Sequence, residues 1–247
     1  MTTAIRSGQT TWTRTQGKRL ISIDQMRALA LVLMAVFHFG YDLSVFGYLS
    51  FDAKAPFWAV FRSIIVTLFF LSVGASLVLA NANGIRWRAF WIREIKIVAG
   101  ALTFSVATFF LYPSNWIWFG VLHFIAVASL LALPLIYTPR LALMAGIAII
   151  ALFNLTDWFN LAPLYQALRE PLNLPDRTMD LTRLIPWLGM VYIGIYLGHK
   201  RLFGINRLPL LPTTGPFLWL SRHSLGFYMI HQIPLYGLAW LIYILVG

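Results

Sequence analysis

The sequence predicts an all-α membrane protein, a polytopic bundle of about seven transmembrane helices whose N-terminus is cytoplasmic. Hydrophobic residues make up 60% of the 247 positions and charged residues only 11%, unlike the mixture in a soluble domain. Apolar runs long enough to cross a bilayer recur along the chain. The basic residues gather in alternate loops between these runs, and this pattern sets the orientation.

Seven apolar segments are expected to cross the membrane in turn. Residues 1–20 precede them as a basic cytoplasmic tail, and residues 21–247 form a single transmembrane domain without an internal repeat or linker. The length of the chain suits one bundle and leaves no room for a sizeable soluble domain. The expected spans are residues 21–43, 57–80, 90–111, 116–137, 140 to 154 or 157, 184–198 and 217–246.

The formal net charge of +11 indicates topology and does not indicate a nucleic-acid partner. The chain lacks the interleaved basic and aromatic residues of proteins that bind single strands. The positive charge lies before the first span and after the second and sixth, as in multi-pass proteins of the inner cell membrane. Whether these residues also contact anionic membrane lipid or a phosphorylated cosubstrate stays open. They are Arg6, Arg14, Lys18, Arg19, Arg86, Arg88, Arg93, Lys96, Lys200, Arg201 and Arg207.

The first span carries a stripe of ionisable residues. Arg27 and His38 are eleven positions apart, so a helix places them on one face, about 16 Å apart along its axis. Charged groups within a span usually face the protein interior or a wet cavity, so this helix should line a polar chamber. Its polar side is predicted to contain Asp24, Arg27, Met34, His38, Tyr41 and Asp42, and its apolar side Leu29, Val32 and Val36.

His38 is the candidate for proton transfer, because imidazole exchanges protons near neutral pH and the guanidinium of Arg27 does not. Asp42 lies one helical turn beyond His38, where its carboxylate could orient the ring. Two alternatives stay open. Arg27 and His38 would then serve only as buried hydrogen-bonding groups between spans, and Asp42 as an interfacial carboxylate in water.

Other polar residues are expected at similar depths. Tyr228 and His231 share a face of the last span, and His231 lies well within the hydrocarbon, where it needs a partner. Cavity lining and structural hydrogen bonding both account for it. His123 lies at the same predicted depth as His38 and is expected to join the chamber. Arg62, near the outer end of the second span, would bind an anionic acceptor or Asp42, or extend to the interface.

Two patterns of small residues are better explained by helix packing than by chemistry. They are the Gly194–Gly198 pair and the Ser72–Ser76 pair, each with the spacing that lets helices approach closely. The sequence has no phosphate-binding glycine motif, no HExxH and no GxSxG. It has no cysteine, and its five histidines are scattered, so no metal site is predicted.

The motifs resemble those of membrane acyltransferases. Asp24-x-x-Arg27, an apolar run and His38 resemble the Arg-x10-His signature on the first helix of the type-3 family. The chain as a whole is similar to small bacterial proteins of the heparan-alpha-glucosaminide N-acetyltransferase catalytic-domain family. The matching pieces are residues 19–42, 119–126, 186–198 and 221–232.

The resemblance implies transfer of an acyl group, expected to be acetyl, from cytosolic acyl-CoA to an amine or hydroxyl of an extracytoplasmic saccharide or glycolipid. It implies that His38 is the catalytic base or acyl carrier and that Arg27 positions the donor or supports the site. In the lysosomal members the loop after the first helix is implicated in catalysis, whereas residues 44–56 here contain no histidine. Heparan itself is therefore not the expected acceptor. The phosphates of the donor would be bound by Arg27, Arg86, Arg88, Arg93 and Lys200.

A transporter of small solutes or protons is the alternative function, because polar stripes in helices also mark ion paths. Against it, the sequence has no inverted repeat and no matched pair of interrupted spans. A structural membrane protein without chemistry would leave the polar stripe unexplained. The oligomeric state cannot be read from the sequence.

Overall fold

The computed structural model describes residues 20–202 and 205–246, so the predicted tail lies outside the described residues except for Leu20. Regular structure in this part of the chain is helical throughout, apart from an isolated bridge between Phe119 and Leu181. The α-helices are α1 (Ile21–Val45), α2 (Pro56–Ala80), α3 (Trp87–Leu111), α4 (Val121–Ala132), α5 (Pro139–Leu155), α6 (Ala162–Arg169), α7 (Leu184–His199), α8 (Gly215–Arg222), α9 (Ser224–Ile230) and α10 (Gln232–Val246), with a 3-10 turn, η1 (Leu133–Leu135).

Three of these helices are long and apolar enough to cross a membrane. Helices α1, α2 and α3 have 25 residues each, or about 37 Å of helix. A fourth candidate span consists of α9 and α10, which meet at an angle of 40°. The structure thus confirms an all-helical protein with three or four candidate spans, while the expected total of about seven and the cytoplasmic N-terminus stay predictions.

Two of the expected spans differ from the helices in the structure. The fourth begins as a helix only at Val121. It ends at Ala132, and a 3-10 turn that contains Pro134 follows. The last is not continuous, since helix ends separate α8, α9 and α10 at His223 and His231. Pro234 explains the second break, because it lacks an N–H and its ring clashes with the carbonyl of Ile230 four residues earlier.

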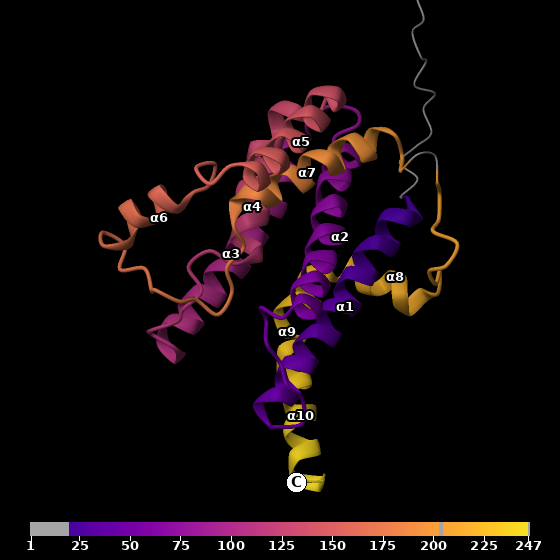
Figure 1. Ribbon diagram of the computed structural model, residues 1–247. Coiled ribbons are helices and arrows are strands. Elements are labelled where there is room, and N and C mark those ends of the chain that lie inside the picture. The colour runs from indigo at the N-terminus through magenta and orange to yellow at the C-terminus, as the bar shows by residue number, and fades with distance from the viewer. Residues whose placement is uncertain (1–19, 203–204, 247) are drawn as a thin grey trace, which may run out of the picture.

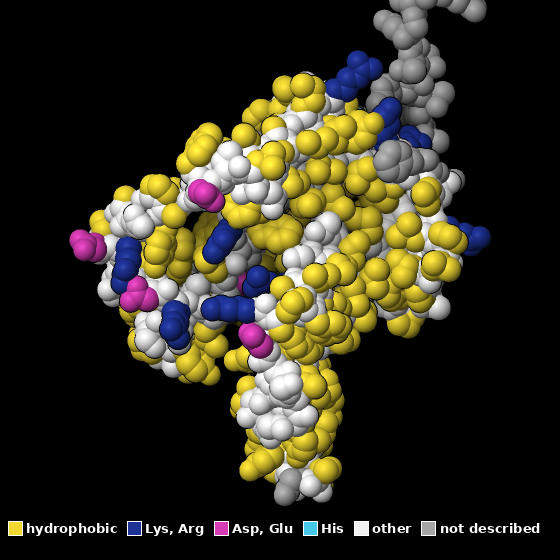
Figure 2. Space-filling model, in the orientation of Figure 1, with side chains coloured by type: hydrophobic (Ala, Val, Ile, Leu, Met, Phe, Trp, Pro, Cys, Tyr) yellow, Lys and Arg dark blue, Asp and Glu magenta, His cyan; other side chains and the backbone are white. Residues whose placement is uncertain are grey.

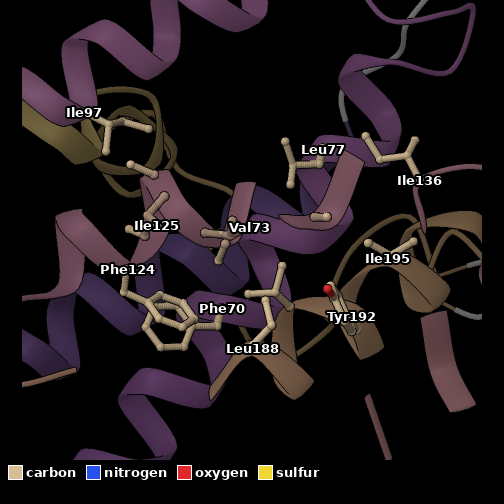
Figure 3. Packing of buried hydrophobic residues seen from close by; sticks show 14 of the residues in the cluster. Phe70, Val73, Leu77, Ile97, Phe124, Ile125, Ile136, Leu188, Tyr192 and Ile195 are labelled. Carbon is tan, nitrogen blue, oxygen red and sulfur yellow. The ribbon is translucent and has the colours of Figure 1, made fainter. Parts of the chain in front are cut away.

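The core forms where α2 packs against α7. A Cβ atom on Gly194 would stand 2.4 Å from the carbonyl oxygen of Leu71, and one on Gly198 would stand 2.9 Å from the Cα of Ala75. The predicted packing role of these two glycines is therefore confirmed. Figure 3 shows the core around Phe70, whose ring lies against that of Phe124. The two ring centroids are 4.1 Å apart. Helices in lipid associate through such close packing contacts, because the surrounding lipid is as apolar as their side chains and the hydrophobic effect does not drive them together.

Two buried side chains fasten the loop between α7 and α8 to the first helix. Ser22 donates a hydrogen bond to the carbonyl of Ile205 at 3.0 Å. Gln25 accepts one from the N–H of Leu208 at 2.7 Å and donates one to the carbonyl of Leu211 at 2.8 Å. The start of α1, the loop and α8 consequently form one unit, which Figure 1 shows at the right of the bundle. In the same view α2 lies at the centre, and α10 extends away from the other helices.

Candidate active site where α1 meets α9 and α10

The first helix turns its ionisable residues inward, largely as predicted. Asp24 and Asp42 are 5% and 1% exposed, whereas Val32 and Val36 on the opposite side are 38% and 54% exposed. Tyr41 is the exception. We expected it on the polar side, but it is 47% exposed and packs against Phe51.

Two histidine rings lie face to edge beside the C-terminal half of this helix. The ring centroids of His38 and His231 are 5.1 Å apart, with an angle of 63° between the rings. His231 is 7% exposed and comes from the break between α9 and α10, and His38 is half-buried. Phe227 stacks on His231 and the edge of Phe37 contacts His38, so apolar rings border the pair.

Asp42 is bound by the start of α10. The side-chain amide of Gln232 donates a hydrogen bond to its Oδ1 at 2.7 Å. The sequence left open whether Asp42 orients the ring of His38. In the structure Asp42 bonds to Gln232, and the ring of His38 makes no hydrogen bond to another described residue. The physical reason is that a buried carboxylate needs a donor, and Gln232 supplies one directly from the facing helix.

Buried polar atoms without a partner are concentrated at this junction. Within the described residues four such side-chain atoms exist, Asp42 Oδ2, Glu94 Oε2, His231 Nε2 and Gln232 Oε1. Three of the four belong to neighbouring residues around the histidine pair. An unpaired buried polar atom costs about 1–3 kcal/mol, and such groups often mark a place where function needs them. The junction therefore offers one nitrogen and two oxygens to a polar ligand.

The N-terminal half of the polar stripe is held by two neighbouring helices. Asp24 accepts a hydrogen bond from the hydroxyl of Ser221 on α8 at 3.0 Å. Arg27 donates one to the hydroxyl of Ser76 on α2. Arg27 and His38 thus lie on one side of α1, and residues from α2, α8, α9 and α10 contact that side.

The open chamber expected along this stripe stays a prediction. Two hollows of about 400 Å³ and 310 Å³ lie elsewhere, one along the face of α2 that carries Ser63 and Thr67, the other beside Ser105 and Trp116. Figure 2 shows a further hollow between the α3–α4–α6 part and the α1–α2 part, with basic and acidic side chains at its rim.

Asp180, in the loop between α6 and α7, is an acid that we did not single out from the sequence. Its Oδ2 accepts a hydrogen bond from the N–H of Val121 at 3.1 Å, at the start of α4. Burial raises the pKa of this carboxyl, while the Val121 N–H and the charge of Arg62 act in the opposite direction. Arg62, expected to bind an anionic acceptor or Asp42 or to extend to the interface, thus has its charge near Asp180. Tyr228 also lies within the electrostatic range of Asp180 and packs against His231 at 5.9 Å.

His123, also expected in the chamber, is bound within the contact between α3 and α4. Its Nδ1 accepts a hydrogen bond from the N–H of Gly120 at 3.2 Å, and its Nε2 lies 3.1 Å from the hydroxyl of Ser105. Ser105 in turn donates to the carbonyl of Ile117 at 2.6 Å. None of these partners belongs to the histidine pair, so both ring nitrogens serve the helix contact.

The residues predicted to bind the donor's phosphates divide into two groups. Arg86, Arg88 and Lys200 are exposed. They belong to the end of the bundle where α2 and α7 finish and α3 begins. Arg93 lies further along α3, where it pairs with Glu94 and donates to Ser129 at 3.1 Å. Its charge is therefore already neutralised within the protein.

A known protein family matches most of the chain, including the residues of this junction. The family model described as "Heparan-alpha-glucosaminide N-acetyltransferase, catalytic" matches residues 19–233, which include His38, Asp42, His231 and Gln232. The chain belongs to this family. Membership implies an acetyltransferase that works in a membrane, as the sequence resemblance predicted. The comparisons with curated proteins and with solved structures each give no significant match.

Sequence reasoning did not assign a role to Gln232 or Asp180. Gln232 belongs to the polar stretch of residues 221–232, and its position next to His231 was a usable signal. No local pattern pointed to Asp180. It lies in a loop between two prolines, and its contact with Val121 spans 59 positions.

Proposed function

We propose that the protein transfers an acetyl group from cytosolic acetyl-CoA to an amine or hydroxyl of an extracytoplasmic saccharide or glycolipid. The reaction would take place beside His38, on the outer half of α1. The observation that carries the proposal is the gathering of three unpartnered buried polar atoms around a histidine pair, inside the region that matches an acetyltransferase family.

The chemistry of acetyl transfer fits residues of this kind. The acceptor must lose a proton as its oxygen or nitrogen attacks the thioester carbonyl, and histidine performs such proton transfer at neutral pH. His38 would act as the base or would carry the acetyl group for a moment as a nucleophile. Arg27, about 16 Å further in along the helix, would contact the donor on its way to His38.

The two ends of the bundle would meet the two substrates. Exposed Arg86, Arg88 and Lys200 offer cationic groups to the phosphates of coenzyme A at the inner end. Arg93 is a weaker candidate, because Glu94 already occupies it. At the outer end, Arg62, Asp180 and Tyr228 are available to an acceptor with hydroxyl or amino groups. The protein would then be a multi-pass protein of the inner cell membrane with donor and acceptor on opposite sides.

A direct assay tests this function. The purified protein in detergent or nanodiscs receives acetyl-CoA together with glucosamine, or with a glycolipid extract, and the released thiol and the acetylated product are measured. We expect transfer by the wild type and a loss of about 100-fold or more in His38→Ala. His223→Ala should transfer normally, because the ring of His223, between α8 and α9, is exposed. Absence of transfer by the wild type with both acceptors would contradict the proposal.

Transport of a small solute is the second candidate, favoured by one observation. The bent α9–α10 pair places a buried histidine and an unpaired amide oxygen at a break in a candidate span. Transporters use such breaks, but in corresponding pairs. Solute flux into proteoliposomes without consumption of acetyl-CoA would favour transport over transfer.

A further inference from the structure

At the break between α9 and α10, the backbone carbonyl of Tyr228 is bound by a side chain in place of a backbone N–H. The N–H of His231 bonds to the carbonyl of Phe227 at 2.9 Å, and the N–H of Leu235 bonds to the carbonyl of His231 at 3.3 Å. Within the described residues, no backbone N–H reaches the carbonyl of Tyr228 between them. The Nδ1 atom of His231 lies 2.8 Å from this carbonyl oxygen and takes the place of the missing donor.

This contact assigns the tautomer of His231. A carbonyl oxygen can only accept, so Nδ1 must carry the hydrogen of the neutral ring. Nε2 then has no hydrogen and presents its lone pair. The same Nε2 is buried and has no partner within the described residues. The helix break therefore leaves a buried basic nitrogen without a partner among the described residues, on a ring whose centroid is 5.1 Å from that of His38.

His38 lacks this fixation. Its ring contacts Phe37 and His231 through its faces and edges, and it makes no hydrogen bond to another described residue. A base is most effective when a second group holds its ring and tautomer, as the carbonyl of Tyr228 holds His231. The two histidines are thus unlike in the property that a general base requires.

We propose that His231, through Nε2, is the general base of the acetyl transfer. The inference rests on the proposed function and assigns the proton-transfer step within it. Nε2 takes the proton of the acceptor's hydroxyl or amine while the acceptor atom bonds to the carbonyl carbon of the thioester. The carbon–sulfur bond then breaks, and the proton passes from the imidazolium to the leaving thiolate of coenzyme A. In this direct transfer His38 takes neither the proton nor the acetyl group, and its ring lies beside the reacting groups.

The decisive variant is His231→Asn. The amide nitrogen of asparagine stands near the position of Nδ1 and keeps a donor for the carbonyl of Tyr228, but nothing replaces Nε2. We expect kcat for transfer from acetyl-CoA to glucosamine to fall about 10²- to 10⁴-fold, while KM for acetyl-CoA stays within about threefold. Melting of the purified protein should be close to that of the wild type, because the helix break keeps its hydrogen bond.

His223→Asn is the matched control. The Nδ1 of His223 makes the same kind of contact, 3.0 Å from the carbonyl of Trp219, but its ring is exposed and stacks on Trp219. This substitution should leave kcat within about twofold of the wild type. A large loss in both variants would mean that the contact with the carbonyl matters for structure alone, and it would overturn the assignment.

A second measurement distinguishes a base from a structural residue. Added imidazole should restore part of the activity of His231→Ala, at least about tenfold above the variant alone, because a free base can enter the space of the lost ring. This measurement decides the question if His231→Asn fails to fold. Normal kcat in His231→Asn, or no recovery in His231→Ala, overturns the inference while the proposed function stands. If the wild type transfers no acetyl group at all, the proposed function fails and the inference fails with it.

Discussion

Two histidine-containing junctions of this bundle use the same side chain in opposite ways. Where α3 meets α4, His123 accepts from Gly120 and binds Ser105, and Ser105 donates to Ile117, so both ring nitrogens of His123 and the hydroxyl of Ser105 have partners. Where α1 meets α9 and α10, the junction around His38 and His231 keeps three buried polar atoms without one.

The difference teaches which histidines are candidates for chemistry. Both junctions lie in apolar helices, and His123 and His38 were predicted at the same depth, so depth and residue type do not distinguish them. The hydrogen bonds of the two junctions do distinguish them. A closed chain of donors and acceptors stabilises a helix contact, whereas unpaired buried atoms are retained at a cost and often mark a functional site.

The strongest test of the contrast between the two junctions is a variant that should lose activity and keep its stability. His38→Ala should lower acetyl transfer by about 100-fold or more, with a melting temperature close to that of the wild type, because the ring makes no hydrogen bond to be lost within the described chain. Transfer and melting are measured on the same purified sample. A variant that melts far below the wild type and loses activity only in proportion would assign His38 to structure.

The pairing of Asp42 with Gln232 gives the next largest effect. Gln232→Leu removes the amide donor from a carboxylate that is 1% exposed, which should destabilise the protein by about 1–3 kcal/mol. The double variant Asp42→Leu with Gln232→Leu should recover part of this loss, because no unpaired buried carboxylate remains. Strictly additive losses in the three variants would show that the two side chains do not depend on each other.

At the junction of α3 and α4, where both ring nitrogens of His123 have a partner, we expect a substitution of His123 to lower stability without lowering catalysis. His123→Ala leaves the N–H of Gly120 and the hydroxyl of Ser105 each without one partner. This should cost about 1–2 kcal/mol, or several degrees in melting temperature. The kcat of the protein that remains folded should be unchanged. A selective fall in kcat would move His123 into the active site and remove the contrast.

Much of the fold could be predicted because the signals are local. Apolar runs locate the helices, and the eleven-residue step from Arg27 to His38 correctly predicts a side of α1 that faces its neighbours. The small-residue spacing of Gly194 and Gly198 likewise predicts the contact with α2. Each of these inferences needs only the geometry of a single helix.

The rest depends on contacts between distant segments. His38 could be placed on a face, but its closeness to His231 joins positions 193 apart and follows from the bend at Pro234. Asp42 was paired with its neighbour on the same helix, yet its partner is Gln232, 190 positions away. Periodicity assigns a residue to a face and does not identify the helix opposite.

Asp180 gives the smallest expected effect and probes the edge of the junction of α3 and α4. Because burial raises the pKa of this carboxyl, the folded state binds its proton more tightly than the unfolded chain does. Its contribution to stability is therefore present below the unfolded pKa of about 3.9 and is lost as pH rises through the higher folded value. Asp180→Asn keeps an oxygen for the N–H of Val121 but cannot ionise. The melting temperature of the wild type, compared with that of Asp180→Asn, should fall as pH rises from about 4 to about 7. The opposite slope would mean that Arg62 and the start of α4 stabilise the carboxylate more than burial disfavours it. Asp180 would then hold the loop between α6 and α7 to α4 as a charged group.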